Sequence, residues 1–366
     1  MTLPDDLLLR PELAGIPGYV PGRSEAEVAA AYGLDHVIKL ASNESAHGPL
    51  PGVLERAVAR ATSTHRYPDT DASQLRHALA DRFDLDPSRI VAGCGSVALC
   101  QQLTLSTAGP GDEVLFPWRS FEAYPVFTAV VGATPVRVPL RADFSLDLQA
   151  MARAVTDRTR LVLVCTPNNP TGPAVSAAEL AAFLEVVPPR VTVVIDEAYL
   201  EYAAGPDLPD GLALARRFPN VAVLRTFSKA YGLAALRVGW CYAPPALAEG
   251  LRRTSIPFAV SALAEAAAVE ALQEQAEVAR RATETIGERE RVTAGLRAAG
   301  LAVPDSQANF VWLPLGERSV AFTDGLIRQG LITRCFAGDG IRVTLGLPAE
   351  NDLLLAGADR LLRAGA

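Results

Sequence analysis

Short apolar runs alternate with helical stretches along the chain from about residue 90. The runs are rich in Val, Ile and Leu and are bounded by Gly, Pro and Asn, a pattern typical of buried strands. We predict strands at 90–92, 113–116, 134–138, 161–165, 191–195, 221–225 and 238–242. Helices are expected at 96–107 and 121–131, and Ser176 with Glu179 forms a capping box that begins another. Nearly continuous apolar strands separated by helices indicate an α/β fold with a mostly parallel sheet covered on both faces.

The pattern changes after residue 258. Residues 261–300 are Ala-rich and largely helical, and a final helix ends the chain after three short strands, at 309–313, 331–335 and 341–345. We therefore predict a large domain at 39–258 and a smaller α+β C-terminal domain at 259–366, in keeping with a chain of 366 residues. Residues 1–38, with scattered Pro and Gly, are interpreted as an N-terminal arm.

Polar residues directly follow four of the predicted strands. The segments are Gly93–Ser96, Asn168–Gly172, Asp196–Tyr199 and Thr226–Lys229. A lone Asp after a strand is usually a helix cap, but four such segments in sequence order are hard to explain by structure alone. Ligands of open parallel sheets bind beyond the carboxyl ends of the strands, so we predict the functional site there.

The chain contains only two lysines, Lys39 and Lys229, among 34 basic residues. A primary amine, unlike a guanidinium, can lose its proton near neutral pH and condense with an aldehyde. Lys229 lies among aromatic and small residues, which makes it a candidate Schiff-base lysine. The alternative is a chance survivor in an arginine-rich chain, and we interpret Lys39 in that way.

Composition excludes several classes of function. The net charge of −7 argues against nucleic acid or an anionic membrane as the main partner. The longest uncharged stretch, 90–111, is too polar to span a membrane, and Asp5 and Asp6 argue against a signal peptide. Five scattered cysteines without a CxxC pair, and four histidines without ligand spacing, indicate a cytoplasmic protein with neither disulfides nor a metal site.

The turn from Gly93 to Ala98 also fits the loose dinucleotide pattern GxGxxA, with acidic residues further on at Asp112 and Glu113. A nicotinamide enzyme is therefore an alternative. The glycines show only that a phosphate can approach the free amides of a helix N-terminus, and a monophosphate satisfies that arrangement equally well.

Four segments together carry a family resemblance: 65–69 (HRYPD), 167–172 (PNNPTG), 196–199 (DEAY) and 228–237 (SKAYGLAALR). They resemble pyridoxal-phosphate aminotransferases of fold type I, in the branch of histidinol-phosphate aminotransferase. The resemblance runs from Leu40 to Arg342. Within that branch, 93–102, 118–124 and 306–314 look like the actinobacterial phenylalanine (aromatic amino acid) aminotransferases.

The resemblance implies a role for each residue around pyridoxal 5'-phosphate. Lys229 holds the coenzyme and moves the proton, while Asp196 faces the pyridine nitrogen. Tyr199 and Asn169 bind the phenolic oxygen, and Phe121 stacks on the ring. The phosphate is bound by Ser96, Val97, Thr226, Ser228 and Arg237. Tyr67 reaches across from a neighbouring subunit, which implies a homodimer with a shared active site.

The same resemblance implies the substrate contacts. Arg342 matches a clamp for the substrate anion, and Arg334 is a second candidate anion group. Tyr19 and Asn43 lie in segments that close over the substrate. One departure is His47, in Ser-Ala-His-Gly-Pro, where much of the branch has Asn-Pro-Tyr-Gly-Pro, and its role is left open.

We therefore expect an aminotransferase that moves the amino group between an aromatic L-amino acid and a 2-oxo acid such as 2-oxoglutarate, by a ping-pong mechanism. Histidinol-phosphate aminotransferase is the nearest alternative. A pyridoxal-phosphate decarboxylase of the threonine-phosphate type, a nicotinamide dehydrogenase and a non-enzymatic scaffold are kept as further alternatives.

Overall fold

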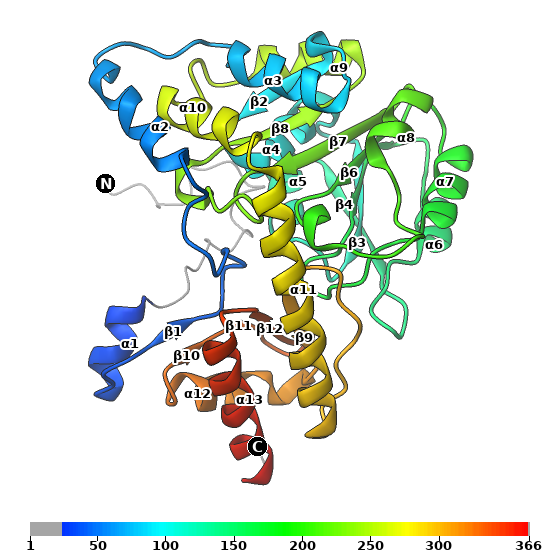
Figure 1. Cartoon of the computed structure of the whole chain (residues 1–366). Coiled ribbons are helices and arrows are strands. Elements are labelled where there is room, and N and C mark those ends of the chain that lie inside the picture. Colours follow the sequence, from blue (N-terminus) through cyan, green and yellow to red (C-terminus); the bar gives the residue numbers. More distant parts are fainter. Residues whose placement is uncertain (1–23, 365–366) are drawn as a thin grey trace, which may run out of the picture.

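The computed structural model describes residues 24–364. A seven-stranded sheet forms the centre of the larger part of the molecule, with the strand order β2-β8-β7-β6-β5-β3-β4 (Figure 1). Its strands are β2 (Ile90–Gly93), β3 (Glu113–Trp118), β4 (Thr134–Pro139), β5 (Thr159–Cys165), β6 (Thr192–Asp196), β7 (Val221–Thr226) and β8 (Gly239–Tyr242). All seven strands predicted from the sequence are present, so the α/β fold is confirmed.

One strand runs against the others. β8 pairs antiparallel with both β2 and β7, whereas β3, β4, β5, β6 and β7 pair in parallel. Parallel strands need a long crossover, usually a helix. The connection from β7 to β8 holds only a short 3-10 turn, Ala234–Leu236, so the chain turns back beside β7. Lys229 lies in this connection.

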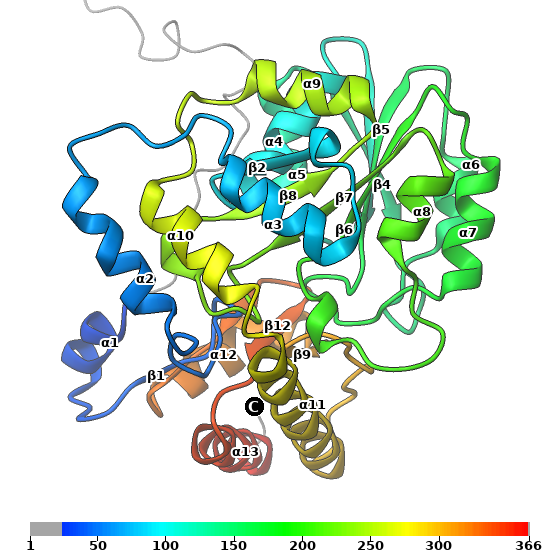
Figure 2. The ribbon, with the colours of Figure 1, turned by 45° about the horizontal axis from the view of Figure 1, so that its top comes forward.

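Helices cover both faces of the sheet (Figure 2). The first face packs against α3 (Ser73–Phe83), α6 (Leu148–Arg153), α7 (Ala177–Val186), α8 (Gly211–Arg217) and α10 (Ala262–Ala271). The other face packs against α4 (Gly95–Thr107), α5 (Ala123–Val130) and α9 (Pro245–Thr254). Because both faces are covered, the central strands are apolar on both sides, which explains their continuous Val, Ile and Leu runs.

A smaller sheet follows in the sequence and lies at the lower end of the view in Figure 1. It has the antiparallel order β11-β12-β9 and packs on α11, α12 and α13. The bounds here are α11 (Gln275–Ala298), β9 (Phe310–Leu313), α12 (Ser319–Ile327), β11 (Arg334–Phe336), β12 (Gly340–Thr344) and α13 (Pro348–Arg363). The domain boundaries proposed from the sequence stay a prediction.

The chain before the large sheet touches the small one. β1 (Ile38–Lys39) pairs in parallel with β10 (Leu331–Ile332), next to α1 (Glu25–Tyr32). The predicted strand 331–335 is thus two strands, because β10 pairs with β1 and β11 pairs with β12. The helix α2 (Val53–Arg60) then leads back to the large sheet. None of the helices described between residues 24 and 364 is long and apolar enough to cross a bilayer.

Candidate active site

The four polar segments meet at one edge of the large sheet. β2, β5, β6 and β7 share one direction, so their carboxyl ends lie together. β7 ends at Thr226 and β6 ends at Asp196, which places the segments that follow them side by side. The four segments singled out from the sequence are therefore brought together at this edge.

Lys229 presents its amine to this edge. The side chain is half-buried, and Nζ donates a hydrogen bond to the Ser42 carbonyl at 3.1 Å and lies 5.8 Å from the centre of the Tyr199 ring. Burial, with the positive charges of Arg342 and Arg237 nearby, lowers the pKa of Lys229 to about 7. A large fraction of the amine is therefore neutral and nucleophilic at neutral pH.

Asp196 is a buried carboxylate at the end of β6. Its Oδ2 accepts a hydrogen bond from the Tyr124 hydroxyl at 2.8 Å, and its Oδ1 accepts one from the Ala198 N–H at 3.3 Å. Burial raises the pKa of Asp196 to about 6, although the Tyr124 hydrogen bond lowers it. Among residues 24–364, Asp196 makes no salt bridge, so a cationic ligand group would stabilise it.

Tyr124 was missed as a site residue in the sequence. Its side chain is fully buried on α5, where it packs edge-to-face on Phe121 at 5.5 Å between ring centres. Its position three residues before Phe127 marks it as an ordinary core residue. The one available signal was its place three residues after Phe121, the predicted stacking residue, which is itself half-buried.

Two hydrogen bonds bring the small sheet and the segment before α2 to the site. Asn43 donates to the Tyr199 hydroxyl at 2.9 Å, and Arg342 Nη1 donates to the Asn169 side-chain oxygen at 2.5 Å. Arg342 Nη2 also donates to the Ala41 carbonyl at 2.6 Å. Burial raises the pKa of Tyr199, so its hydroxyl remains a neutral donor. These contacts join predicted coenzyme residues to predicted substrate residues.

An anion cradle lies at the N-terminus of α4. No side chain caps this helix end, and its first turn holds no acidic residue, so its amides are available to a ligand. A Cβ atom at Gly95 would lie 2.5 Å from Nη2 of Arg237, and one at Gly239 would lie 2.5 Å from the Ser96 nitrogen. Only glycine allows the arginine and the helix end to approach this closely.

The remaining cradle residues come from β7 and the connection after it. Arg237 Nη1 donates to Ser228 Oγ at 3.3 Å, and Thr226 Oγ1 accepts from the Ser228 N–H at 3.1 Å. Val97 lies in the first turn of α4 and is 39% exposed. Free amides, hydroxyls and a guanidinium thus lie near one another, and these are the groups that bind a phosphate.

Arg334 is already paired with a carboxylate. Its Nη2 lies 3.1 and 3.0 Å from the two Glu122 oxygens, and its Nε lies 3.3 Å from one of them. Glu122 lies 212 residues away in the sequence, so no local pattern predicts this pair. Arg334 lies directly across from Arg342 in the small sheet, and its charge is compensated by Glu122. Its role as a second anion group stays a prediction.

Tyr67 lies on the surface of the described chain, away from this constellation. Tyr67 is 82% exposed and stacks on Phe258, with 4.5 Å between ring centres. Its predicted role lies in a neighbouring subunit, so it stays a prediction. Tyr19 lies outside the described residues.

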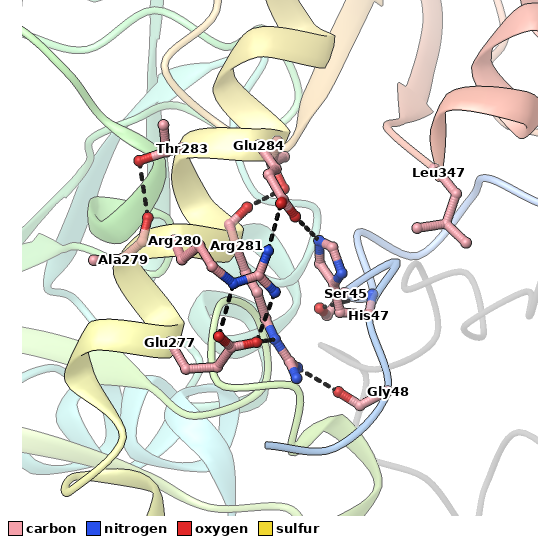
Figure 3. A network of polar contacts seen from close by, with 12 residues as sticks. Ser45, His47, Gly48, Glu277, Ala279, Arg280, Arg281, Thr283, Glu284 and Leu347 are labelled. Atoms are coloured by element: carbon pink, nitrogen blue, oxygen red, sulfur yellow. Dashed lines mark hydrogen bonds and ion pairs between the residues drawn. The ribbon is translucent and has the colours of Figure 1, made fainter. Parts of the chain in front are cut away.

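His47 contacts α11 rather than the amine at Lys229 (Figure 3). Its Nε2 lies 3.7 Å from Glu284, and Arg281 of the same helix donates to the Gly48 carbonyl at 2.6 Å. Burial first, and then Arg281, lowers the pKa of His47. The segment that follows Asn43 is thus anchored on α11.

The positions of Asp112 and Glu113 argue against a nicotinamide enzyme. Glu113 begins β3, at the amino end of the strands, and pairs with Arg158, while Asp112 pairs with Arg160. An acid that binds a ribose must lie at the carboxyl edge. Within residues 24–364 no cluster of His, Cys, Asp or Glu could hold a metal ion either.

The residues present fit pyridoxal phosphate. The amine of Lys229 suits an aldehyde, the buried carboxylate of Asp196 suits a ring cation, and the α4 cradle suits a monophosphate. All three lie at the same edge of the sheet.

The comparison with known proteins defines the class. The model of the family "Aminotransferase class I and II" matches residues 35–357, so the chain belongs to this family and is a pyridoxal-phosphate-dependent transaminase that acts on small amino and oxo acids.

The names of similar proteins are consistent with this assignment. The chain is 52% identical over 347 residues to the aromatic amino acid aminotransferase of Mycobacteroides abscessus, covering 95% of this chain and 97% of the relative. It is 51% identical over 353 residues to the aromatic amino acid aminotransferase of Streptomyces avermitilis, with 96% and 97% covered. A solved histidinol-phosphate aminotransferase from Sinorhizobium meliloti, in complex with pyridoxal-5'-phosphate, is 29% identical, with a TM-score of 0.89 and 98% of each chain covered.

Proposed function

We propose that the protein transfers the amino group between an aromatic L-amino acid, such as phenylalanine, and a 2-oxo acid, such as 2-oxoglutarate. The observation that carries this choice is the identity of about half of all residues, over 95% of the chain, with relatives named aromatic amino acid aminotransferase. Both half-reactions use the same site, one after the other, because one amine and one anion clamp serve both substrates.

Pyridoxal phosphate, when bound, supplies an electron-withdrawing ring that stabilises negative charge at the substrate α-carbon. We assign to Lys229 the capture of the coenzyme aldehyde and, once released, the transfer of the proton at the α-carbon. Asp196 would keep the ring nitrogen protonated, and Tyr124 orients this carboxylate and stabilises its negative charge through a hydrogen bond of 2.8 Å. The cradle of Ser96, Val97, Thr226, Ser228 and Arg237 binds the phosphate.

The hydrogen bonds at the same edge support an assignment of the substrate contacts. We assign the substrate carboxylate to Arg342, whose planar fork suits a carboxylate. Tyr199 and Asn169 would bind the phenolic oxygen of the coenzyme, and Asn43 holds the Tyr199 hydroxyl in position at 2.9 Å. Phe121 is assigned to the ring face.

We further propose a homodimer in the cytoplasm. Tyr67 exposes 82% of its surface on the single chain, which supports its assignment to the site of a second copy. All five cysteines are free, which suits a reducing compartment.

Histidinol phosphate is a second candidate amino donor. The observation in its favour is the structural similarity to the histidinol-phosphate aminotransferase of Sinorhizobium meliloti, with a TM-score of 0.89. Steady-state kinetics with each donor and 2-oxoglutarate separates the two. We expect kcat/KM for phenylalanine to exceed that for histidinol phosphate by at least about 10-fold, a difference of about 1.4 kcal/mol in transition-state binding. The opposite ratio, or release of carbon dioxide as from a decarboxylase, contradicts the proposal.

A further inference from the structure

Glu197 and Arg225 form a buried ion pair directly beside two residues of the site. Glu197 follows Asp196 in the sequence, and Arg225 precedes Thr226. Arg225 Nε donates a hydrogen bond to Glu197 Oε2 at 2.8 Å, and the side chains of Arg225 and Glu197 are only 10% and 1% exposed. Neither residue has a role in the function proposed above, although both are charged groups taken out of water.

The pair lies on the face of the sheet opposite to the Asp196 carboxylate. Neighbouring residues of a strand point to opposite faces, and Asp196 contacts Tyr124 on α5. The Arg225 guanidinium instead lies 5.3 Å from the ring centre of Phe83 and 5.5 Å from that of Trp240. The ion pair is therefore behind the site, and it acts on a ligand through its neighbours in the chain rather than by contact.

Backbone pairing between β6 and β7 stops at this point. Asp196 and Leu224 are the last paired residues, and the Glu197 N–H donates to the Leu224 carbonyl at 2.9 Å. The chain then leaves the sheet in the turn that carries Tyr199. The second carboxylate oxygen of Glu197 accepts the Gly211 N–H, at the start of α8, at 3.2 Å. One side chain thus ties the end of β6 to both β7 and α8.

Each charge of the pair depends on the other. Burial lowers the pKa of Arg225, but the charge of Glu197 outweighs this effect and raises the pKa overall. Burial raises the pKa of Glu197, and Arg225 counteracts the rise. Loss of one partner leaves the other charge buried without compensation, which strongly perturbs its surroundings. A substitution at either position is therefore transmitted to the adjoining strand ends.

We infer that Glu197 and Arg225 are positioning residues, whose ion pair fixes the separation between Asp196 and Thr226. The ring nitrogen and the phosphate of the coenzyme are assigned to these two residues, so their separation has to match one small molecule. The inference rests on the roles proposed for Asp196 and Thr226, and it adds the element that sets their spacing.

The test is the substitution Glu197→Gln in the full-length protein, with Kd measured for pyridoxal phosphate and for inorganic phosphate. Gln keeps the size of the side chain and removes its charge. We expect Kd for pyridoxal phosphate to rise by about 10- to 100-fold, because a misplacement of about 1 Å can cost about 100-fold. Kd for inorganic phosphate should change by less than about 3-fold, since this ion binds the cradle alone.

This difference between the two ligands separates positioning from a loss of stability. A site that is merely less stable loses affinity for both ligands alike, because both bind only the folded chain. The double variant Glu197→Met with Arg225→Met leaves no buried charge, so it should fold even where the single variant does not. We expect the same difference between the two ligands in the double variant.

Two controls isolate the ion pair. Glu113→Gln also neutralises a buried carboxylate that pairs with an arginine, Arg158, but at the amino end of the strands. Both Kd values should change by less than about 3-fold in this variant, because it is remote from the site. Arg225→Lys keeps a positive charge beside Glu197, so it should bind pyridoxal phosphate at least about 3-fold more tightly than Arg225→Met.

Asp196→Asn separates failure of the inference from failure of the proposed role of Asp196. Weaker coenzyme binding in Asp196→Asn, with unchanged binding in Glu197→Gln and in the double variant, overturns the inference and leaves that role standing. Unchanged coenzyme binding in Asp196→Asn overturns both. Equal losses for the two ligands in Glu197→Gln, or an equally large effect of Glu113→Gln, also overturn the inference.

Discussion

Substitution of Asp196 by Asn should make the coenzyme-free protein more stable at pH 8. In the folded chain the pKa of Asp196 is about 6, against 3.8 for an unperturbed Asp, because the carboxylate is buried. The difference is about 2 pH units, and at about 1.4 kcal/mol per unit its ionisation costs about 3 kcal/mol of unfolding free energy. Asn removes this cost.

Asn also has a cost of its own. Its carbonyl can accept the Tyr124 hydrogen bond, but its NH₂ group then faces the Ala198 N–H, which now donates to Asp196 at 3.3 Å. Loss of one such hydrogen bond costs about 1 kcal/mol. The expected net gain for Asp196→Asn at pH 8 is therefore about 2 kcal/mol.

The effect of Asp196 on the unfolding free energy depends on pH in a definite direction. A raised folded pKa means that the native Asp196 holds its proton up to about pH 6, so wild-type stability falls as the pH rises from about 4 through about 6. The advantage of the variant should disappear near pH 4, where both chains are neutral at this position. Chemical denaturation of the coenzyme-free proteins, at one fixed protein concentration, measures the difference in unfolding free energy.

With pyridoxal phosphate bound, the wild type should be more stable than the variant, because the ring cation compensates the charge of Asp196 and has no charge to compensate at Asn. A coenzyme-free variant that is no more stable than the wild type at pH 8 would show that the buried Asp196 charge is not destabilising. Equal coenzyme affinity in the two proteins would contradict the contact of Asp196 with the ring cation.

Three further substitutions test other assignments. Arg342→Leu should raise KM for both substrate carboxylates by about 10- to 1000-fold in steady-state assays, because a charge-assisted fork is lost; an unchanged KM would move the clamp elsewhere. Tyr124→Phe removes the hydrogen bond that lowers the Asp196 pKa, so the acidic limb of the kcat profile should move up by about 1 pH unit, and an unmoved limb contradicts this role. Lys229→Ala should abolish transamination while calorimetry still detects coenzyme binding through the phosphate cradle; retained turnover excludes Lys229 as the acid–base group.

The sequence was sufficient to locate the site because the carboxyl ends of parallel strands share one edge. Asp196 and Lys229 could be placed there from strand order alone, and the structure puts them together. The direction of β8 could not be predicted, since an apolar strand reads the same in either direction and only the short connection after β7 reveals it.

Hydrogen-bond and salt-bridge partners that depend on tertiary packing could not be predicted either. Tyr124 looks like a core residue because its ring is buried, and only the direction of its hydroxyl gives it a second role. The Glu122–Arg334 pair joins positions 212 residues apart, and no local pattern contains such a contact. Charge compensation within a site therefore needs the three-dimensional register of both sheets.

Every role proposed for the site depends on the capture of the coenzyme aldehyde by the amine of Lys229. The most direct measurement is borohydride reduction of the active, coenzyme-saturated protein, followed by peptide mass spectrometry. We expect the reduced pyridoxyl-phosphate adduct on Lys229 and none on Lys39, the only other lysine of the chain. An unmodified Lys229 in such a sample would contradict it.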